Sequence, residues 1–592
     1  MGLVFGKHPT DSTAALAPGA DPLAHGPIAL YWRKTHGEDQ CGAMARLTTA
    51  EAVIESLLQH GIDTLYALPG VHNDHLFDAA QRAGDRMRVI HARHEQTAAY
   101  MALGAALATG KPQAFAVVPG PGLLNASAAL LTAYGMGAPV IALVGQIASF
   151  AIDQGHGHLH EIHDQLGLLR HITRHAARIR TPHEAPALVA EAIRMACGGR
   201  SGPVALECAI DVWGIEGEVS FPPIAPPAVP PIDAAAVRRA AELLGAAEKP
   251  LIVVGGGALD AGAEVLAVAE ALRAPVTSFR RGRGVIPTTH ELAMSFTEGH
   301  ALWKDADAVL AIGTRLYWQQ SVWGVDDKLP IVRLDIDPEE INRFRRPACG
   351  LVGDAVTVLR ALLAELPAHN HARDRAVELA AVHAAFAQRL TRIAPQLGFL
   401  RAIRAALPDD GIYVEEVTQV GFASRLAFPV PAPRSFLSPG YQDTLGWGYG
   451  TALGAQAASP GRKVVLATGD GGFMYQAAEL ATAMRHNLPV VVVVFDDGAF
   501  GNVRRIQQEH YGNRLIACDL TNPDFVKFAE SFGMAAFRAD TPERLEAALH
   551  QAFALNAPAL VHVKVGQLPS AWGMILLPRV RGFADAWRPA LP

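Results

Sequence analysis

The chain has 592 residues, of which 50% are hydrophobic and 18% are charged, and its formal net charge is −6. Because a single hydrophobic core stops growing at roughly 250–300 residues, this length predicts several domains. The small negative charge, without any basic run, excludes the electrostatic footprint of a nucleic-acid-binding protein. The five cysteines show no C-x-x-C spacing, which indicates ordinary thiols in a reducing compartment rather than a disulfide framework or a zinc site.

Nothing in the sequence predicts a membrane span or a secretory signal. The most continuous apolar run, residues 488–495, is much shorter than the roughly 20 residues that a membrane helix needs. Residues 1–43 contain proline, glycine and charge without an apolar signal core, and they are predicted to form an irregular extension. We therefore expect a soluble, cytoplasmic protein that binds neither membrane nor nucleic acid.

From residue 44 to residue 220, short β-rich runs alternate with helix-like segments. Residues 140–144 and 204–209 are typical of the predicted strands, and residues 95–108 of the predicted helices. This alternation predicts a parallel sheet covered by helices. Residues 221–232 then contain six prolines, which neither a helix nor an inner strand accommodates, and so they predict a linker.

Two further α/β units follow the linker. The first, residues 233–366, has predicted strands at residues 251–254, 276–278, 309–312 and 331–335. A polar, helical connector, residues 367–395, leads to the last unit at residues 396–570 and a tail at residues 571–592. The first and last units have similar lengths and a similar alternation of predicted strands and helices, which is the pattern expected after an ancient duplication. The predicted fold is three consecutive α/β domains with mainly parallel sheets.

A glycine-rich motif in the last unit carries the clearest chemistry. Gly469-Asp470-Gly471-Gly472-Phe473 lies between a predicted strand at residues 464–467 and a predicted helix at residues 475–485. A glycine turn at the start of a helix offers free backbone N–H groups to a phosphate. Asp470 repels a bare phosphate, but Mg²⁺ binds carboxylate and phosphate oxygens together. The motif therefore predicts a magnesium–phosphate site.

A second acidic turn follows one crossover later. The predicted strand at residues 490–495 ends in Asp496-Asp497-Gly498, and the 27 residues from Asp470 to Asp497 fit one strand–helix–strand unit. Both acidic groups then lie at the carboxyl edge of the sheet, where ligands of open α/β sheets bind. The alternative is two glycine-rich surface turns that merely contain aspartates.

Together these motifs resemble the thiamine-diphosphate (ThDP) enzyme superfamily, in its acetolactate-synthase-like branch. Its cofactor motif is GDG followed, one crossover later, by NN or ND. The resemblance implies that Asp470, Asp497 and the backbone carbonyl of Ala499 hold Mg²⁺. Asp496 stands where the first Asn is usual. Two carboxylates in place of amides are expected to tighten metal binding and to weaken the contact with the diphosphate.

The resemblance also implies which residues contact the cofactor. Leu445, in Asp443-Thr444-Leu445-Gly446, is expected to hold the cofactor in its V shape, and the carbonyl of Asp443 to accept from the 4′-amino group. The full expected cofactor-binding set is Val417, Thr418, Gln419, Asp443, Leu445, Gly469, Gly471, Gly472, Ala499, Phe500, Gly501 and Asn502.

In the first unit, Glu95 matches the family's catalytic glutamate. The resemblance implies a hydrogen bond from Glu95 to N1′ of the aminopyrimidine, which promotes deprotonation of the thiazolium C2. The alternative is a glutamate that merely favours the first turn of a helix. Residues 119–125, with the sequence Pro-Gly-Pro-Gly-Leu-Leu-Asn, resemble the family's glycine–proline loop.

Two histidines are predicted to face the substrate. His72 follows Leu68-Pro69-Gly70-Val71, which is similar to a loop of benzaldehyde lyase, and is expected to shuttle a proton. The alternative for His72 is a loop histidine that only orders its turn. His160 stands where the family usually has a substrate-facing Gln.

His160 belongs to a histidine-rich segment, residues 153–163. A metal site is the alternative to a substrate-facing role for this segment. If the segment is helical, His156, His160 and His163 share a face. Residues 117–120, with the sequence Val-Val-Pro-Gly, lack the adjacent histidines of yeast-type pyruvate decarboxylases, which disfavours simple aldehyde release.

The sequence of the central unit leaves open whether this unit binds FAD. Gly255-Gly256-Gly257, Gly313-Thr314-Arg315 and Asp335-Ile336-Asp337-Pro338 match the part that binds FAD in acetolactate synthases and pyruvate oxidases. Tyr317 and Gln319, however, stand where flavin-binding members often have charged residues, which disfavours FAD.

The resemblance predicts a ThDP- and Mg²⁺-dependent carboligase that decarboxylates a pyruvate-like 2-oxo acid and transfers the carbanion unit to an acceptor. The alternatives are a C–C lyase or decarboxylase of the benzaldehyde lyase type, a FAD-dependent oxidase like pyruvate oxidase, and a degenerate regulatory homologue without activity. The resemblance further implies a homodimer or homotetramer with active sites between chains.

Overall fold

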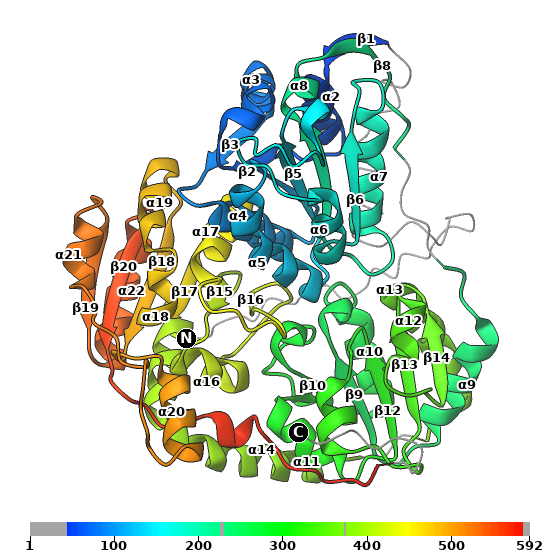
Figure 1. The fold of residues 1–592 in the computed structure, drawn as a ribbon. Helices are drawn as coiled ribbons and strands as arrows, with labels where there is room; N and C mark the ends of the chain where they lie inside the picture. Colours follow the sequence, from blue (N-terminus) through cyan, green and yellow to red (C-terminus); the bar gives the residue numbers. More distant parts are fainter. Residues whose placement is uncertain (1–43, 225–229, 372–373, 584–592) are drawn as a thin grey trace, which may run out of the picture.

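The computed structural model describes residues 44–224, 230–371 and 374–583. The predicted extension at residues 1–43, the middle of the proline-rich linker (225–229) and the end of the tail (584–592) lie outside the described residues. Figure 1 shows three α/β lobes, with the first at the top, the central one in green at the lower right and the last at the left. The predicted fold class is therefore confirmed.

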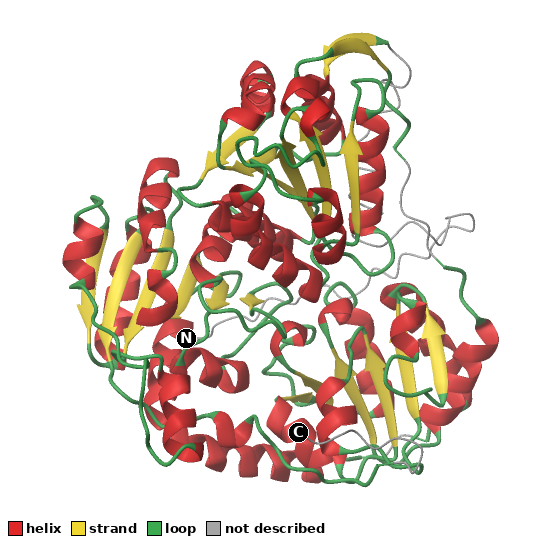
Figure 2. Ribbon diagram, in the orientation of Figure 1, coloured by secondary structure: helices red, strands yellow, loops and turns green. Residues whose placement is uncertain are grey.

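Each lobe is built on a six-stranded sheet, and every pairing within the three sheets is parallel. Helices cover these sheets (Figure 2), so the inner strands are mainly apolar. In the described residues, an antiparallel pair is formed by β1 (Ala45–Thr48) and β8 (Glu216–Val219).

The first sheet has the strand order β3-β2-β4-β5-β7-β6. Its strands are β2 (Thr64–Ala67), β3 (Arg88–His91), β4 (Gln113–Val117), β5 (Val140–Gln146), β6 (His175–Ile179) and β7 (Val204–Ala209). Its helices are α2 (Thr49–Gln59), α3 (Asp74–Arg82), α4 (Glu95–Thr109), α5 (Pro121–Met136), α6 (Gln165–Ile172), α7 (Ala185–Cys197) and α8 (Ile210–Trp213).

The central sheet has the order β11-β10-β9-β12-β13-β14, which is the doubly wound arrangement 3-2-1-4-5-6. Its strands are β9 (Pro250–Val254), β10 (Val276–Ser278), β11 (Ala293–Met294), β12 (Ala308–Ile312), β13 (Ile331–Asp335) and β14 (Cys349–Val352). Its helices are α9 (Ala234–Gly245), α10 (Gly262–Leu272), α11 (Phe296–Trp303), α12 (Pro338–Ile341) and α13 (Ala355–Glu365), followed by the connector helix α14 (Ala376–Leu390).

The last sheet has the order β16-β15-β17-β18-β20-β19, which repeats the topology of the first sheet strand for strand. Its strands are β15 (Ile412–Glu415), β16 (Phe436–Leu437), β17 (Val464–Gly469), β18 (Val490–Asp496), β19 (Ala535–Ala539) and β20 (Ala559–Lys564). Its helices are α15 (Ala394–Ala406), α16 (Gln419–Ala427), α17 (Gly448–Ala458), α18 (Asp470–Met474), α19 (Leu480–His486), α20 (Gly501–His510), α21 (Phe525–Glu530) and α22 (Pro542–Ala554).

One predicted helix is wrong. Residues 475–485 do not form a continuous helix, because helical structure begins at Asp470, within the glycine motif, and α18 ends at Met474. A short 3₁₀ turn, Ala477–Glu479, then leads into α19 at Leu480. The motif is thus itself the first helical turn after β17.

Helices α4 and α17 cross at the junction of the first and last lobes. Both are apolar around almost their whole circumference, and one hydrophobic core includes residues of both lobes. The crossing depends on glycine, because a Cβ at Gly104 would overlap the carbonyl oxygen of Thr451, and one at Gly454 would overlap that of Met101. The two lobes are therefore held together by direct backbone contact between helices.

The segment after residue 570 packs against the central lobe. Thr297 donates to the carbonyl of Met574 (2.7 Å), and the ring of His300 contacts the carbonyl of Pro578 (2.8 Å). Arg581 donates to the carbonyl of Trp303 (2.8 Å). No helix in residues 44–583 that the structure describes combines the length and apolar character needed to cross a membrane.

Candidate active site

The first half of the candidate site lies at the carboxyl ends of β2, β3 and β4. Glu95 opens α4, one short turn after β3, and is half-buried. Its carboxylate accepts a hydrogen bond from the side-chain amide of Asn125 in α5 (3.0 Å). The glycine–proline loop is close by, because a Cβ at Gly122 would lie 3.7 Å from Oε1 of Glu95. The fold thus brings together Glu95 and the loop at residues 119–125.

His72 and His160 meet beside the same loop. Their rings stack with centroids 5.0 Å apart and an interplanar angle of 24°. His72 is buried, and its Nε2 contacts the carbonyl of Leu159 (3.1 Å). Burial, and secondarily the charge of His160, lower the pKa of His72, so this imidazole is neutral at neutral pH. Nδ1 of each ring has no hydrogen-bond partner within the described residues.

The histidine-rich segment is not helical, so the condition under which His156, His160 and His163 would share a helical face is not met. Gly155, Gly157 and His160 all have positive φ angles (68°, 77° and 65°), which interrupt a helix. The Glu161 carboxylate instead accepts from the backbone N–H groups of Gly155 (2.9 Å) and His158 (2.8 Å). No group of three or more His, Cys, Asp or Glu in the described ranges is placed to hold a metal ion.

The second half of the site lies at the carboxyl ends of β17 and β18, where Asp470 and Asp497 meet. Burial raises the pKa of Asp470, and burial together with the charge of Asp470 raises the pKa of Asp497 to about 7. Gln419 donates from its side-chain amide to Asp497, and the N–H of Ala499 donates to the same carboxylate (3.2 Å). Two adjacent carboxylates, one of which raises the pKa of the other, form a donor set that a divalent cation stabilises. These residues therefore fit Mg²⁺.

Asp496 lies beside this donor set, and its charge helps to raise the pKa of Asp470. Its carboxylate accepts from Lys564 (2.9 Å) and contacts the ring of His562 (3.0 Å). Burial alone would raise the pKa of Asp496, but these hydrogen bonds outweigh it and hold the pKa below the ordinary value. The negative charge at this position is thus compensated inside the lobe.

Asn522 was not singled out by the sequence. Its side-chain amide donates both to Asp470 (2.6 Å) and to Asp496 (3.0 Å). It therefore fixes the carboxylate of Asp470 relative to the end of β18. The sequence offers little signal for it, since Asn522 lies 52 residues after Asp470 in a loop without regular structure.

Several other expected cofactor residues lie close to this pair of carboxylates, whereas Asp443 and Leu445 lie in the loop at residues 440–446, where Asp443 pairs with Arg280 and Arg425. A Cβ at Gly469 would lie 3.0 Å from the hydroxyl of Thr418, one at Gly471 would lie 2.8 Å from the ring of Phe500, and one at Gly501 would lie 2.6 Å from Asp497. The remaining members flank these positions: Val417 beside Thr418, Gly472 within α18, Ala499 before Phe500, and Asn502, which accepts from Arg505 (3.2 Å). The missing Cβ atoms at these glycines thus allow Thr418, Phe500 and Asp497 to pack closely against the backbone.

Glu416 is a second residue that the sequence analysis missed. It is fully buried and accepts from the backbone N–H groups of Gly446 (2.6 Å) and Gly448 (3.1 Å) and from the hydroxyl of Thr468 (3.3 Å). Burial raises its pKa to about 7. It fixes the turn that follows Leu445 against β17. Two consecutive glutamates at the end of an apolar strand, Glu415-Glu416, were the available signal.

Comparison with known proteins agrees with this geometry. The N-terminal TPP binding domain of thiamine pyrophosphate enzymes matches residues 47–168, their central domain matches residues 237–362, and their C-terminal TPP binding domain matches residues 416–563. The chain belongs to the thiamine pyrophosphate enzymes. The matched domains support thiamine diphosphate as the cofactor, and the protein is an enzyme of the transferase or lyase type.

The relatives of this thiamine pyrophosphate enzyme extend along most of the chain. The probable 2-ketoarginine decarboxylase AruI of Pseudomonas aeruginosa is 32% identical over 88% of this chain and 94% of its own length. A probable acetolactate synthase large subunit of Methanocaldococcus jannaschii is 33% identical over 87% of this chain and 91% of its own length. The large subunit of acetolactate synthase isozyme 1 of Escherichia coli is 28% identical over 90% of this chain and 96% of its own length. The enzyme is thus similar to acetolactate synthases along its whole three-lobed architecture.

Proposed function

We propose that this enzyme is a ThDP- and Mg²⁺-dependent carboligase, which decarboxylates a pyruvate-like 2-oxo acid and transfers the carbanion unit to an acceptor carbonyl. The observation that carries the proposal is the pairing of two carboxylates, Asp470 and Asp497, at the carboxyl edge of the last sheet, where Asp470 raises the pKa of Asp497 to about 7. The similarity to acetolactate synthase large subunits supports the choice of 2-oxo acids as substrates.

In this proposal Asp470, Asp497 and the carbonyl of Ala499 hold Mg²⁺, and the loop Val417-Thr418-Gln419 contacts the diphosphate. The side chain of Gln419 is held in place from both of its polar atoms. Its amide nitrogen donates to Asp497, and its side-chain oxygen Oε1 accepts from the backbone N–H of Leu568 (2.7 Å). When bound, ThDP would stabilise a carbanion at the former carbonyl carbon of the 2-oxo acid after CO₂ is lost. The protein supplies the binding, the orientation and the proton transfers around it.

Glu95 holds a proton at N1′ of the aminopyrimidine. Asn125 donates to the Glu95 carboxylate and so fixes its orientation. The position of Glu95 at the start of α4 makes it rigid, because α4 is buried along most of its length against α17. A carboxylate on such a fixed element is suited to general acid–base work.

His72 and His160 act on the substrate oxygens. The neutral His72 imidazole accepts or returns a proton at neutral pH, and the free Nδ1 atoms of both rings offer hydrogen-bonding capacity that the surrounding protein does not use. We infer that this pair receives the carboxylate or the hydroxyl of the substrate.

Simple decarboxylation of a larger 2-oxo acid is a second candidate function. The 32% identity to a probable 2-ketoarginine decarboxylase favours it, and the stacked His72 and His160 supply a proton source that release of an aldehyde requires. A C–C lyase of the benzaldehyde lyase type uses the same groups in the reverse direction. The substrate tests below separate these reactions.

The proposal does not require FAD. In the central lobe, the glycine turns Gly255–Gly257 and Gly313 pack directly on one another, and Arg281 lies over Gly256, where a Cβ would be 3.0 Å from its guanidinium carbon. Arg315 stacks on the ring of Tyr441 of the last lobe at 4.4 Å. Arg281 thus packs against the first glycine turn, and Arg315 contacts the last lobe.

We further propose a homodimer or homotetramer with active sites between chains. Among the described residues of one chain, no hydrogen bond or ion pair joins Glu95 to Asp470 or Asp497. Large apolar side chains are exposed beside both halves of the site: Val71, Leu124, Phe150 and Leu159 on the first lobe, and Met474 and Tyr475 on the last. Such side chains support contact with a second copy.

The first test combines cofactor binding with product analysis. Calorimetry should show ThDP binding in the presence of Mg²⁺ and its loss with a chelator. Proton NMR of reactions with pyruvate should then show acetolactate or acetoin. Failure to bind ThDP overturns the proposed function, whereas binding without turnover of pyruvate, together with CO₂ and aldehyde from 2-ketoarginine, favours the decarboxylase.

A further inference from the structure

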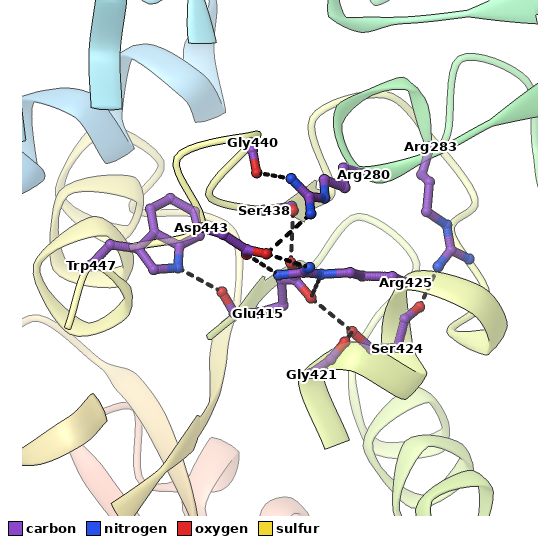
Figure 3. A network of polar contacts seen from close by, with 10 residues as sticks. All are labelled: Arg280, Arg283, Glu415, Gly421, Ser424, Arg425, Ser438, Gly440, Asp443 and Trp447. Atoms are coloured by element: carbon purple, nitrogen blue, oxygen red, sulfur yellow. Dashed lines mark hydrogen bonds and ion pairs between the residues drawn. The ribbon is translucent and has the colours of Figure 1, made fainter. Parts of the chain in front are cut away.

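A side chain of the central lobe reaches the loop expected to shape the cofactor. Arg280 follows β10, at the start of the 3₁₀ turn Arg280–Gly282. It donates to the carboxylate of Asp443 (3.0 Å) and to the carbonyl of Gly440 (Figure 3). Arg280 adopts a φ of +51°, a left-handed conformation that is uncommon for a residue with a side chain. The central lobe thus contacts the 440–446 loop through the strained Arg280, beside the stacking of Arg315 on Tyr441.

Asp443 is held from a second side by the last lobe. Arg425 of α16 donates to both carboxylate oxygens of Asp443 and, through Nε, to both oxygens of Glu415 (2.7 and 3.0 Å). Arg425 and Glu415 are buried, and Ser438 donates to Glu415 (2.7 Å). Burial alone would raise the pKa of Asp443, but Arg425 and Arg280 hold it below its ordinary value, so the carboxylate stays ionised. Two cations and two anions therefore form a balanced network.

The 440–446 loop is fixed at both of its ends. Gly440 is held through its carbonyl by Arg280, and Gly446 is held through its N–H by the buried Glu416 (2.6 Å). Between them Asp443 has a φ of +49°. Left-handed residues persist where surrounding contacts over-determine them, and such strain is common at ligand-binding sites.

Stability alone does not account for this network. Arg425 and Glu415 are buried and Arg280 and Asp443 partly so, and the desolvation cost of burying charges often equals their mutual attraction, so such networks contribute little to folding free energy. They do fix geometry, because a bidentate arginine–carboxylate pair tolerates little displacement. Here the network fixes the conformation of Asp443, which lies two positions before Leu445.

We propose that Arg280 is a positioning residue for the cofactor: through Asp443 and Gly440, the central lobe holds the 440–446 loop in the conformation that presents Leu445 and the Asp443 carbonyl to ThDP. The inference rests on the proposed function of this loop. It assigns the central lobe a part in the ThDP site that needs no nucleotide.

The test compares Arg280→Met with Arg280→Lys, and uses Arg360→Met as the control, since Arg360 is an exposed arginine of α13 in the same lobe, paired with Glu264. ThDP affinity is measured by calorimetry with Mg²⁺, and the environment of the bound aminopyrimidine by near-ultraviolet circular dichroism. Because hydrogen bonds between charged groups are the strong class, Arg280→Met should weaken ThDP binding by about tenfold or more. Arg280→Lys should recover part of that loss, and Arg360→Met should bind as the wild type does.

A double-mutant cycle tests whether Arg280 acts through Asp443. Asn tolerates a positive φ, so Asp443→Asn removes the charge and keeps the backbone conformation accessible. Arg280→Met combined with Asp443→Asn should bind ThDP no more weakly than the poorer single variant. Unchanged affinity and an unchanged dichroism band in a folded Arg280→Met protein overturn the inference, as does a lowered melting temperature with unaltered ThDP binding. Absence of ThDP binding by the wild type itself would instead refute the proposed function.

Discussion

The Asp470–Asp497 pair gives the sharpest prediction for a single residue. Asp497→Ala removes one of the two carboxylates and the acceptor of the Gln419 amide. Because loss even of groups that only orient metal ligands typically costs about 10- to 100-fold in metal affinity, loss of a ligand should weaken Mg²⁺-dependent ThDP binding by at least about tenfold. Calorimetry at fixed Mg²⁺ measures this, with the exposed Asp540→Ala as the control. Equal affinities for the two variants remove Asp497 from the metal site.

Glu95 is predicted to be essential for turnover and dispensable for folding. Glu95→Gln keeps the size of the side chain and an oxygen that accepts from Asn125, so the thermal melting curve should not change. It removes the proton-holding carboxylate, and general acid–base groups typically contribute about 10²- to 10⁴-fold, so kcat should fall by at least about 100-fold. Steady-state kinetics decide the matter, and a kcat within a few-fold of the wild type contradicts the proposed role.

The sequence locates the candidate residues that belong to short motifs and misses those that depend on tertiary contacts. Asp470 and Asp497 could be paired from their spacing, because one crossover returns the chain to the same sheet edge. Asn522 and Arg280 act from loops far away in sequence, so no local pattern announces them. His160 was located by resemblance, but its stacking on His72 requires a loop conformation that the sequence alone did not predict.

Among the helices, the α4–α17 crossing gives a testable expectation about packing. Ala in place of Gly454 favours a helix by about 0.5–1 kcal/mol, yet its Cβ would overlap the carbonyl oxygen of Met101. Backbone atoms cannot move aside as a flexible side chain does, so Gly454→Ala should lower the free energy of unfolding by about 1–3 kcal/mol. Urea denaturation measures this. Gly461→Ala, where a Cβ meets nothing within 4 Å, is the matched control and should be near neutral.

The contact between α19 and β3 predicts a pH dependence of stability. His486 packs edge-on against His91 at 4.9 Å, with Arg88 and Arg485 nearby, and burial lowers its pKa to about 4 from an ordinary value of 6.5. Between these two pH values the unfolded chain binds a proton that the folded chain does not. The free energy of unfolding should therefore fall as the pH is lowered from 6.5 towards 4.

Replacing His486 tests this contribution. His486→Gln should show a shallower loss of unfolding free energy between pH 6.5 and pH 4.5 than the wild type does, because its side chain does not titrate. Urea denaturation at several pH values supplies the measurement. The exposed His550→Gln serves as the control and should retain the wild-type slope. Parallel slopes for wild type and His486→Gln would show that the contact does not perturb this histidine.

Inner strands could be predicted closely, whereas among the edge strands named here only β3 was predicted, one residue early at residues 87–90. The predictions for β7, β10 and β13 agree with the structure at both ends. The edge strands β6, β14 and β19 and the two-residue β16 were missed, because edge strands have one neighbour and tolerate polar or small residues, as in His175-Ala-Ala-Arg-Ile179. A continuous apolar run is a signal of strands buried on both faces, and it weakens at the edge of a sheet.

At the scale of the whole molecule, the first and last lobes share one topology, and each contributes half of the candidate site. The sequence indicated the duplication through similar length and alternation. It did not predict that α4 and α17 would bring the two lobes of one chain into backbone contact. That contact fixes the lobes relative to one another, so the two halves cannot close freely on each other within a chain.

The proposed site between chains can be tested by complementation. If Glu95 of one chain works with Asp470 and Asp497 of another, then Glu95→Gln and Asp497→Ala, each inactive alone, should restore activity when co-expressed. A mixed dimer contains one site with both lesions and one intact site. Random pairing of equal amounts makes half of the dimers mixed, so the co-expressed protein should reach about a quarter of wild-type kcat. Sites contained within single chains give no recovery. As the control, co-expression of Glu95→Gln with Glu95→Gln/Asp497→Ala should stay inactive in either case, since no pairing then contains an intact Glu95.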